Sequence, residues 1–234
     1  MSRARSSVRR QAAFSAAAGA LALAAAACPG RPASAAVPST TTVALSAVQS
    51  AYGQPVTASA AVTTAAGPGE GDVVFSVDGV AFKAGLGADG TASIVLPRAG
   101  AGAHAVQATY LPRDPLLQDG STSSSAGWQV AQVRTRLQVD VTGRRLRAPM
   151  VVHVRAAGEY GTTASGDVRI VVRRWGRKVR VAGGALESGA LTSPVRLATG
   201  PSRRGGYRVA VTYRGDAQHL PATRTVHFRI GPRR

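Results

Sequence analysis

The feature that most constrains this chain is a strand-like segment that occurs twice. Residues 205–216 read GGYRVAVTYRGD, and residues 102–110 read GAHAVQATY. In both segments an apolar residue occupies every second position up to a tyrosine, which is the period of a β-strand with one buried face and not the period of a helix. The two copies lie roughly 100 residues apart, about the length of one domain, so they indicate two domains of one kind.

Most of the chain has the same character. After residue 36, short runs of alternating apolar and polar residues are separated by Gly, Pro and Asp, and no run has the 3.6-residue period of a helix. We therefore predict an all-β chain with two tandem β-sandwiches, over residues 37–132 and 133–234.

Residues 1–36 predict a signal peptide that is removed after export. They contain a basic start, an apolar stretch over residues 12–27 and the small residues ASAA at 33–36. The apolar stretch is shorter and richer in alanine than the ~20 strongly apolar residues of a membrane span. We therefore expect no transmembrane span in the mature chain and a secreted, extracellular or cell-envelope location. The pair Arg9-Arg10 leaves twin-arginine export open beside general export.

Cys28 is the only cysteine, and it ends the apolar run of the leader. The sequence AAACPG around it resembles a degraded lipoprotein box, so a lipoprotein anchored through Cys28 is the alternative to plain secretion. In either case no disulfide can form within the two domains, and each core must be held by apolar burial alone.

The first domain resembles the bacterial immunoglobulin-like repeat of secreted and surface proteins. The resemblance rests on TTTV at 40–43, YGQPVT at 52–57, GDVVF at 71–75, GTA at 90–92 and the segment at 102–110. The chain departs from such repeats over residues 111–125, where a short Gly-Asp turn is usual; this segment is longer and contains Pro112, Pro115 and Leu116-Leu117. The resemblance implies an immunoglobulin-like β-sandwich that serves as a spacer or an adhesive unit, with no catalytic residue.

Two turn signals fall inside the first domain, and the second domain repeats its order. Asp78-Gly79 predicts a tight turn after the strand of Val73, Phe75 and Val77, and Asp89-Gly90 is a second hairpin signal. In the second domain GDV recurs at 166–168. Tyr110 and Tyr213 end equivalent strands, where a sandwich often buries the ring and directs the hydroxyl to a backbone group, so we interpret both as structural.

Positive charge is concentrated in the second domain. Residues 132–234 carry 21 basic and 5 acidic residues, whereas residues 37–131 carry 3 and 6. If the apolar residues of its third, sixth and seventh strands point inward, a set of basic residues shares one exposed face, because these strands are neighbours in an immunoglobulin-type sheet. That set is Arg169, Arg173, Arg208, Arg229 and His227.

Two interpretations of this basic face stay open. Arginine forks suit phosphate and sulfate, which indicates anionic envelope polymers or surface glycans as partners. The polyanion could be teichoic acid, an acidic glycan or a nucleic acid, with no specific nucleic acid expected. Alternatively, the arginines reflect composition, since only two of the 29 basic residues are lysines and a strand that faces water needs charge in any case. The same basic region extends to Arg144, Arg145, Arg147 and the residues around Trp175. For Trp175 two roles stay open: stacking on a ligand, or packing at a strand end.

No motif in the sequence points to an enzyme. The four histidines have no metal-ligand spacing, and no phosphate loop, dinucleotide fingerprint or nucleophile elbow is present. We therefore expect no cofactor, no metal and a monomer. The predicted function is a non-enzymatic, exported structural or adhesive module, and the alternative is a polyanion-binding module that acts through its second domain.

Overall fold

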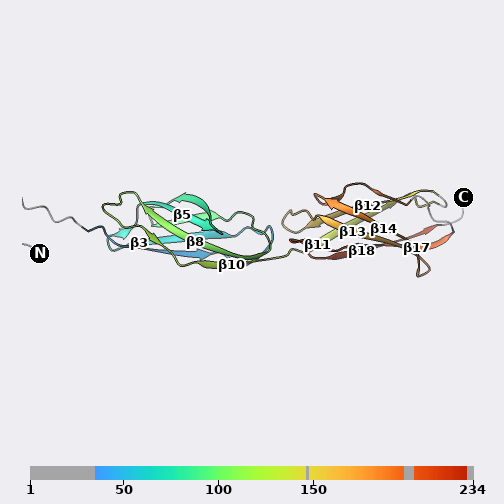
Figure 1. Ribbon diagram of the computed structural model, residues 1–234, viewed down its shortest axis with the longest axis horizontal. Helices are drawn as coiled ribbons and strands as arrows, with labels where there is room; N and C mark the ends of the chain where they lie inside the picture. The colour runs from blue at the N-terminus through green and yellow to red at the C-terminus, as the bar shows by residue number, and fades with distance from the viewer. Residues whose placement is uncertain (1–34, 146–147, 198–202, 231–234) are drawn as a thin grey trace, which may run out of the picture. The chain divides into compact units, whose positions relative to one another are not determined.

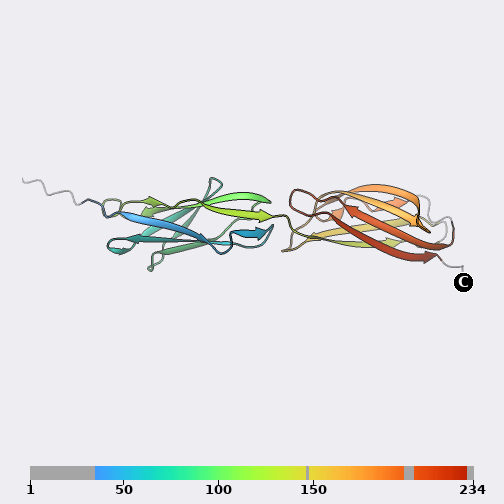
Figure 2. The ribbon, with the colours of Figure 1, turned by 90° about the horizontal axis from the view of Figure 1, so that it is seen from below.

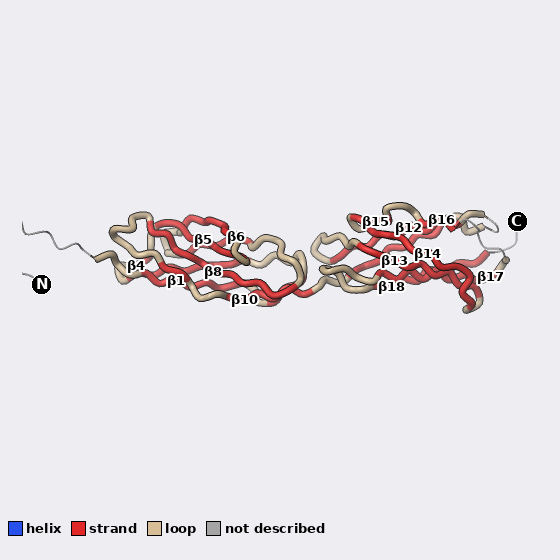
Figure 3. Tube along the Cα trace, in the orientation of Figure 1, coloured by secondary structure: helices blue, strands red, loops and turns tan. Residues whose placement is uncertain are grey.

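The structure is a computed structural model that describes residues 35–145, 148–197 and 203–230. All regular structure in these residues is β-strand, as Figure 3 shows by its uniform red elements. Across these ranges no helix is long and apolar enough to cross a bilayer. The predicted leader, with Cys28, lies outside the described residues, so the signal peptide and the lipoprotein alternative stay predictions.

The first sandwich contains two sheets (Figure 1). The four-stranded sheet has the order β1-β3-β4, and β7 also pairs with β3; its strands are β1 (Ser39–Leu45), β3 (Thr57–Thr64), β4 (Gly67–Pro68) and β7 (Thr91–Val95). The six-stranded sheet has the order β2-β10-β8-β5-β6, with β9 beside β8; its strands are β2 (Gln49–Ala51), β5 (Gly71–Val77), β6 (Val80–Gly85), β8 (Gly102–Pro112), β9 (Ser121–Thr122) and β10 (Ala126–Ala131).

The second sandwich has two layers that are joined along one edge (Figure 2). The first layer is formed by β11 (Thr135–Thr142), β12 (Met150–Gly158) and β16 (Val195–Leu197). The second layer is formed by β13 (Gly166–Arg174), β14 (Arg177–Glu187), β17 (Gly205–Tyr213) and β18 (Ala222–Ile230), in the order β14-β13-β17-β18. The short β15 (Ala190–Leu191) pairs with both β12 and β14, so it connects the layers.

Two separate hydrophobic cores confirm the predicted tandem of sandwiches. One core is built from β3, β5, β7, β8 and β10, and the other from β11, β12, β13, β14, β17 and β18. The predicted alternation holds in both, since the inward rows are buried: Val73, Phe75, Val77, Val106, Ala108, Tyr110, Val168, Ile170, Val172, Val209, Val211 and Tyr213. The domain boundary between residues 132 and 133 stays a prediction.

Tyr110 and Tyr213 occupy equivalent places in the two cores. Both rings are fully buried, and each hydroxyl donates to a backbone carbonyl: Tyr110 to Glu70 at 2.7 Å and Tyr213 to Ser165 at 2.9 Å. Burial raises the pKa of both phenols, which keeps them in the donating, protonated form. Each tyrosine therefore ties the end of a core strand to a loop that is more than 35 residues away in sequence.

One of the two turn predictions is confirmed and the other is wrong. Asp78-Gly79 joins β5 to β6, and both residues have the positive φ of a two-residue hairpin turn, at 49° and 86°. Asp89-Gly90 does not form a hairpin, because β7 pairs with β3 in the opposite sheet. Asp89 instead accepts hydrogen bonds from Thr91, and the Gly90 carbonyl accepts from the Val62 N–H, which directs the chain from one sheet to the other.

We expect Tyr213→Phe to lower the free energy of unfolding by about 1 kcal/mol, because the fully buried tyrosine loses the hydrogen bond from its hydroxyl to the Ser165 carbonyl. Urea titration followed by circular dichroism measures the change. Tyr160→Phe is the matched control: its ring is half exposed, so we expect a change within about 0.5 kcal/mol. Equal losses in the two variants would contradict the structural role of Tyr213.

A second prediction concerns pH. The hydrogen bond between His104 Nδ1 and Asp78, 2.6 Å long, raises the pKa of His104. The Ala105 N–H and His104 lower the pKa of Asp78. A histidine whose pKa is raised by folding stabilises the fold at pH values below its unfolded pKa of about 6.5. An aspartate whose pKa is lowered by folding stabilises the fold at pH values above its unfolded pKa of about 4. The pair therefore contributes most to stability between about pH 4 and pH 6.5.

The free energy of unfolding of wild type should therefore be higher than that of His104→Gln, and this difference should be larger at pH 5.5 than at pH 8.5. Urea titrations of both proteins at the two pH values measure this difference, and the other titrating groups cancel because both proteins contain them. A gap that stays constant or widens toward pH 8.5 would refute the assignment.

Candidate functional site

The strand register of the second sandwich places basic residues in a row. Arg173 on β13 lies opposite Arg208 on β17, and Arg208 lies opposite His227 on β18. Lys178 on β14 continues the row on the other side of Arg173, next to a register shift between Val172 and Arg173. Directly opposite residues have Cβ atoms about 4.5–5.5 Å apart, so four basic side chains follow one another across the sheet.

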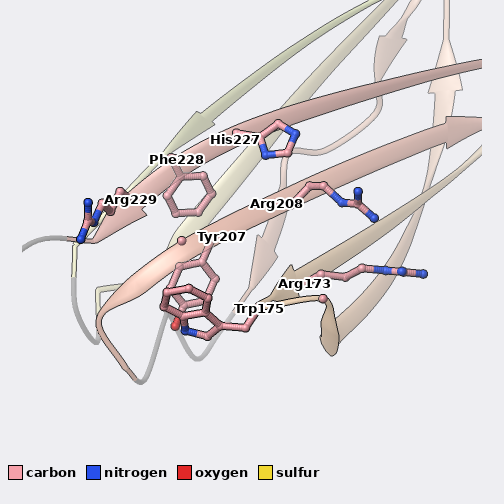
Figure 4. A pocket seen from close by; sticks show the side chains of 9 residues that line it. Arg173, Trp175, Tyr207, Arg208, His227, Phe228 and Arg229 are labelled. Carbon is pink, nitrogen blue, oxygen red and sulfur yellow. The ribbon is translucent and has the colours of Figure 1, made fainter.

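An open groove of about 570 Å³ contains most of this row (Figure 4). It brings together four of the five residues that the sequence predicts as a site: Arg173, Arg208, His227 and Arg229. The other lining residues are Trp175, Gly176, Gly206, Tyr207 and Phe228. Arg169 does not line the groove; it lies four residues before Arg173 on β13, opposite Thr212, beside a separate hollow with Asp167 and Arg214.

The hollow shape of the groove follows from the residues at the end of the sheet. Arg229 lies opposite Gly206, which has no side chain to fill the space between the two strands. Below this space the rings of Tyr207 and Phe228 stack with centroids 5.6 Å apart and planes inclined by 12°. The Tyr207 hydroxyl donates to the Arg203 carbonyl, so the aromatic floor is fixed at its outer end.

The groove has a positive potential that no neighbouring carboxylate reduces. Within the described ranges Arg173, Arg208 and Arg229 form no ion pair, and no acidic residue lines the groove. The five acidic residues of the second domain lie outside the groove lining: Asp140 on β11, Asp167 and Glu187 at the opposite ends of β13 and β14, and Glu159 and Asp216 in loops. The arginine forks are therefore free to bind oxyanions from solvent.

The neighbouring arginines have structural contacts. Arg174 donates through Nε and Nη2 to the Arg204 carbonyl, at 3.2 and 2.8 Å, and so connects the end of β13 to the start of β17. Arg144 lies 5.8 Å from the centroid of the Phe228 ring, donates to the Val141 carbonyl and is 3.8 Å from Asp140. Arg147, which the sequence adds to this region, lies outside the described residues.

The sequence left open whether Trp175 stacks on a ligand or packs at a strand end, and the structure places it in the lining of the groove. Its side chain is 71% exposed and lines the groove from the turn between β13 and β14. The dipeptide Trp175-Gly176 between two alternating runs is a signal for a two-residue hairpin, and both residues have positive φ. The signal is weak in the sequence because asparagine, aspartate or glycine usually occupies the first position.

A hydroxyl–imidazole–carboxylate cluster lies elsewhere in the second sandwich. His219 Nδ1 lies 2.9 Å from Asp216 Oδ1, and Nε2 lies 3.0 Å from Thr162 Oγ1. Burial opposes ionisation of Asp216, but the N–H groups of Ser165 and Gln218 and the His219 ring hold its pKa well below the ordinary value. Thr162 and His219 are buried and the Thr162 hydroxyl donates to the Glu159 carbonyl, so this cluster stabilises loops and offers no open nucleophile.

No group of three or more His, Cys, Asp or Glu side chains within the described ranges is placed to hold a metal ion. His104 lies at the edge of the first core beside Trp128, His153 is exposed on β12, and His227 lines the groove. Asp216, which ends the Arg-Gly-Asp sequence at 214–216, is already used by the internal hydrogen bonds of its own turn.

The row of opposed cations generates a prediction about stability. Like charges directly across a strand pair are destabilising, so Arg208→Thr should raise the free energy of unfolding by about 0.2–1 kcal/mol at low ionic strength. The gain should shrink at about 0.5 M NaCl, where the charges are screened. Arg155→Thr is the control, since Arg155 lies opposite the neutral Gln138. Denaturant titrations in both salt conditions test this, and a gain equal to that of the control would contradict it.

Comparison with known proteins gives matches in structure only. No family model and no curated protein matches the sequence. A tetra-tandem repeat from the extending region of a large adhesion protein is similar over 84% of this chain, with 17% identity and a TM-score of 0.43. The Yersinia pseudotuberculosis adhesin InvE is similar over 82%, with 14% identity and a TM-score of 0.39. These matches cover 50% and 59% of those two chains, respectively, so this chain spans about half of the first and less than two thirds of the second. Fibronectin(III)-like modules of Clostridium thermocellum CbhA are similar over 81% of this chain and 94% of theirs, with 14% identity and a TM-score of 0.30.

Proposed function

We propose that this chain is a non-enzymatic, exported adhesive module whose second sandwich binds anionic polymers through the groove of Arg173, Arg208, His227 and Arg229. The observation that carries the proposal is the cross-strand row Arg173–Arg208–His227, which gathers basic side chains in a groove that no carboxylate lines. The proposed export rests on the predicted leader. The proposed adhesive role rests on the resemblance of the first domain to immunoglobulin-like repeats.

The chemistry of the row suits a repeating anion. Each arginine presents several N–H donors in a planar fork that can engage phosphate, sulfate or carboxylate in two parallel hydrogen bonds. Neighbouring strands are about 4.8 Å apart, and alternate residues along one strand are about 6.8 Å apart, so the cations form a grid over which an extended chain of acidic groups can lie. Binding of an anion also relieves the repulsion between Arg173 and Arg208.

The geometry favours binding over catalysis. The groove is lined by cations, aromatic rings and glycines, and the one histidine in it, His227, has an arginine as its cross-strand neighbour. The cluster that combines a hydroxyl, an imidazole and a carboxylate is buried and used for loop structure. A stable sandwich with an exposed basic face is suited to reversible, salt-dependent attachment.

The test compares two charge-matched quadruple variants of the mature chain. The first changes Arg169, Arg173, Arg208 and Arg229 to Gln. The second changes Arg134, Arg136, Arg155 and Arg196 to Gln; these residues are also exposed, and three of them lie on β11, β12 and β16 of the other layer. Both variants lose the same net charge, so a difference between them reports position and not total charge.

We expect wild type and the second variant to stay on a heparin column to higher NaCl concentrations than the first variant. Arg173, Arg208 and Arg229 line the groove, so losing these three contacts should reduce the magnitude of the slope of log K against log salt by up to about 3. Similar losses in the two variants would refute a defined site and favour the compositional interpretation of the arginines. If wild type does not bind at physiological salt, the module is a structural spacer and the polyanion proposal is wrong.

A further inference from the structure

Trp175 is exposed but held in a defined orientation. Its backbone has a φ of +49°, a region that L-residues with large side chains rarely adopt, and Gly176 follows with a φ of +77°. The same chain uses serine and glycine at the equivalent turn of Ser188-Gly189. A bulky indole at such a position costs backbone strain, and this strain must be offset by a contact of the side chain.

That contact is with the start of β17, 30 residues later in the sequence. A Cβ atom added to Gly205 would lie only 3.0 Å from the indole Nε1 and 3.2 Å from Cε2 and Cζ2, so the ring rests against the bare backbone of the glycine. The Arg174 guanidinium lies 5.9 Å from the ring centroid. The indole is therefore backed by the protein and also exposed to solvent in the groove (Figure 4).

The indole and the cations share one groove, so a single ligand can reach both. Arg173, Arg208, His227 and Arg229 line the same cavity as Trp175. A ligand made only of anionic groups would use the arginines and leave the ring in water. A ligand that carries a ring with an apolar face beside its acidic groups would contact the indole and the arginines at the same time. The indole would then contribute a large contact area at low entropic cost.

We propose that the polymer bound by this groove is an acidic polysaccharide, and that Trp175 stacks on one of its sugar rings while the arginines bind the flanking sulfate or carboxylate groups. This inference rests on the proposed function and specifies its ligand class. A nucleic acid fits less well, because grooves for single strands stack successive bases on several aromatic side chains. Among the described residues, this groove exposes one large aromatic ring, Trp175, beside the smaller imidazole of His227, since Tyr207 is buried and Phe228 is half-buried.

The variant that tests this is Trp175→Asn, because asparagine accepts positive φ and is common in such turns. The variant should keep the wild-type melting temperature within about 3 °C, so a loss of binding will not reflect a loss of folding. Tyr160→Asn is the matched control. Tyr160 also has a positive φ, precedes a glycine and exposes 49% of its ring, but it lies in the turn between β12 and β13, outside the groove lining.

Dissociation constants are measured at one fixed salt concentration for three probes: chondroitin sulfate, inorganic polyphosphate and a single-stranded oligonucleotide. We expect Trp175→Asn to weaken binding of chondroitin sulfate about 5- to 30-fold, the order expected for one stacked ring. Binding of polyphosphate, which has no ring, should change less than twofold. Tyr160→Asn should leave all three constants within twofold of wild type.

A spectroscopic readout accompanies the affinities. The chain contains two tryptophans, and Trp128 is buried in the first core with its Nε1 donating to Ser50. Chondroitin sulfate should therefore shift the emission of wild type to shorter wavelength and reduce its quenching by acrylamide. Both changes should be absent from Trp175→Asn, where only Trp128 emits.

The remaining outcomes overturn the inference in distinguishable ways. If chondroitin sulfate binding is unchanged in Trp175→Asn, the stacking role is wrong, while the proposed function stands if the quadruple arginine variant still loses retention. If polyphosphate binding falls equally, the indole only organises the arginines. If the oligonucleotide loses more affinity than the glycan, the ligand is a nucleic acid. If wild type binds none of the three probes, both the inference and the proposed function are wrong.

Discussion

The backbone pairing of β13, β17 and β18 is the constraint on which the rest of the second sandwich depends. Because side chains alternate across a strand, a register that buries Ile170, Val211 and Tyr213 also fixes which residues point outward. The same hydrogen bonds that build the core therefore align Arg173, Arg208 and His227. A shift of the strand register by one residue would turn the apolar side chains toward solvent and would separate the basic side chains. The fold and the candidate site are therefore specified by the same register.

The groove lies where this regular pairing ends. Along the middle of the sheet the outward positions are filled by Val171, Ala210 and Thr225, which lie side by side by register. Toward the end of the strands Gly205 and Gly206 remove side chains, and the turn at Trp175-Gly176 projects an indole against the exposed backbone. Glycine thus creates the hollow and the support for the ring, and the contact of the indole with Gly205 offsets the backbone strain at Trp175.

Burial without disulfides supplies the stability that this arrangement needs. Each sandwich has one apolar core and one buried tyrosine that donates to a distant carbonyl, from Tyr110 to Glu70 and from Tyr213 to Ser165. In the second sandwich the turn after Tyr213 is further fixed by Asp216, which accepts hydrogen bonds from several backbone N–H groups. A core held in this way can carry a row of mutually repelling arginines, whose cost of about 0.2–1 kcal/mol per pair is a small part of the total.

The sequence by itself determined the properties that depend on local periodicity: strands in place of helices, two cores, and the division of Val168, Ile170 and Val172 from Arg169 and Arg173. It also indicated the tight turn at Asp78-Gly79, because two adjacent residues suffice for that geometry. Only the tertiary structure decided that Asp89-Gly90 leads to the opposite sheet and that Arg169 lies outside the groove. The sequence placed Trp175 beside the basic residues but did not indicate the contact of its ring with Gly205, which is 30 residues away. The physical reason is that alternation is a property of one strand, whereas pairing partners, register and the end of a sheet are set by contacts between segments that are distant in the chain.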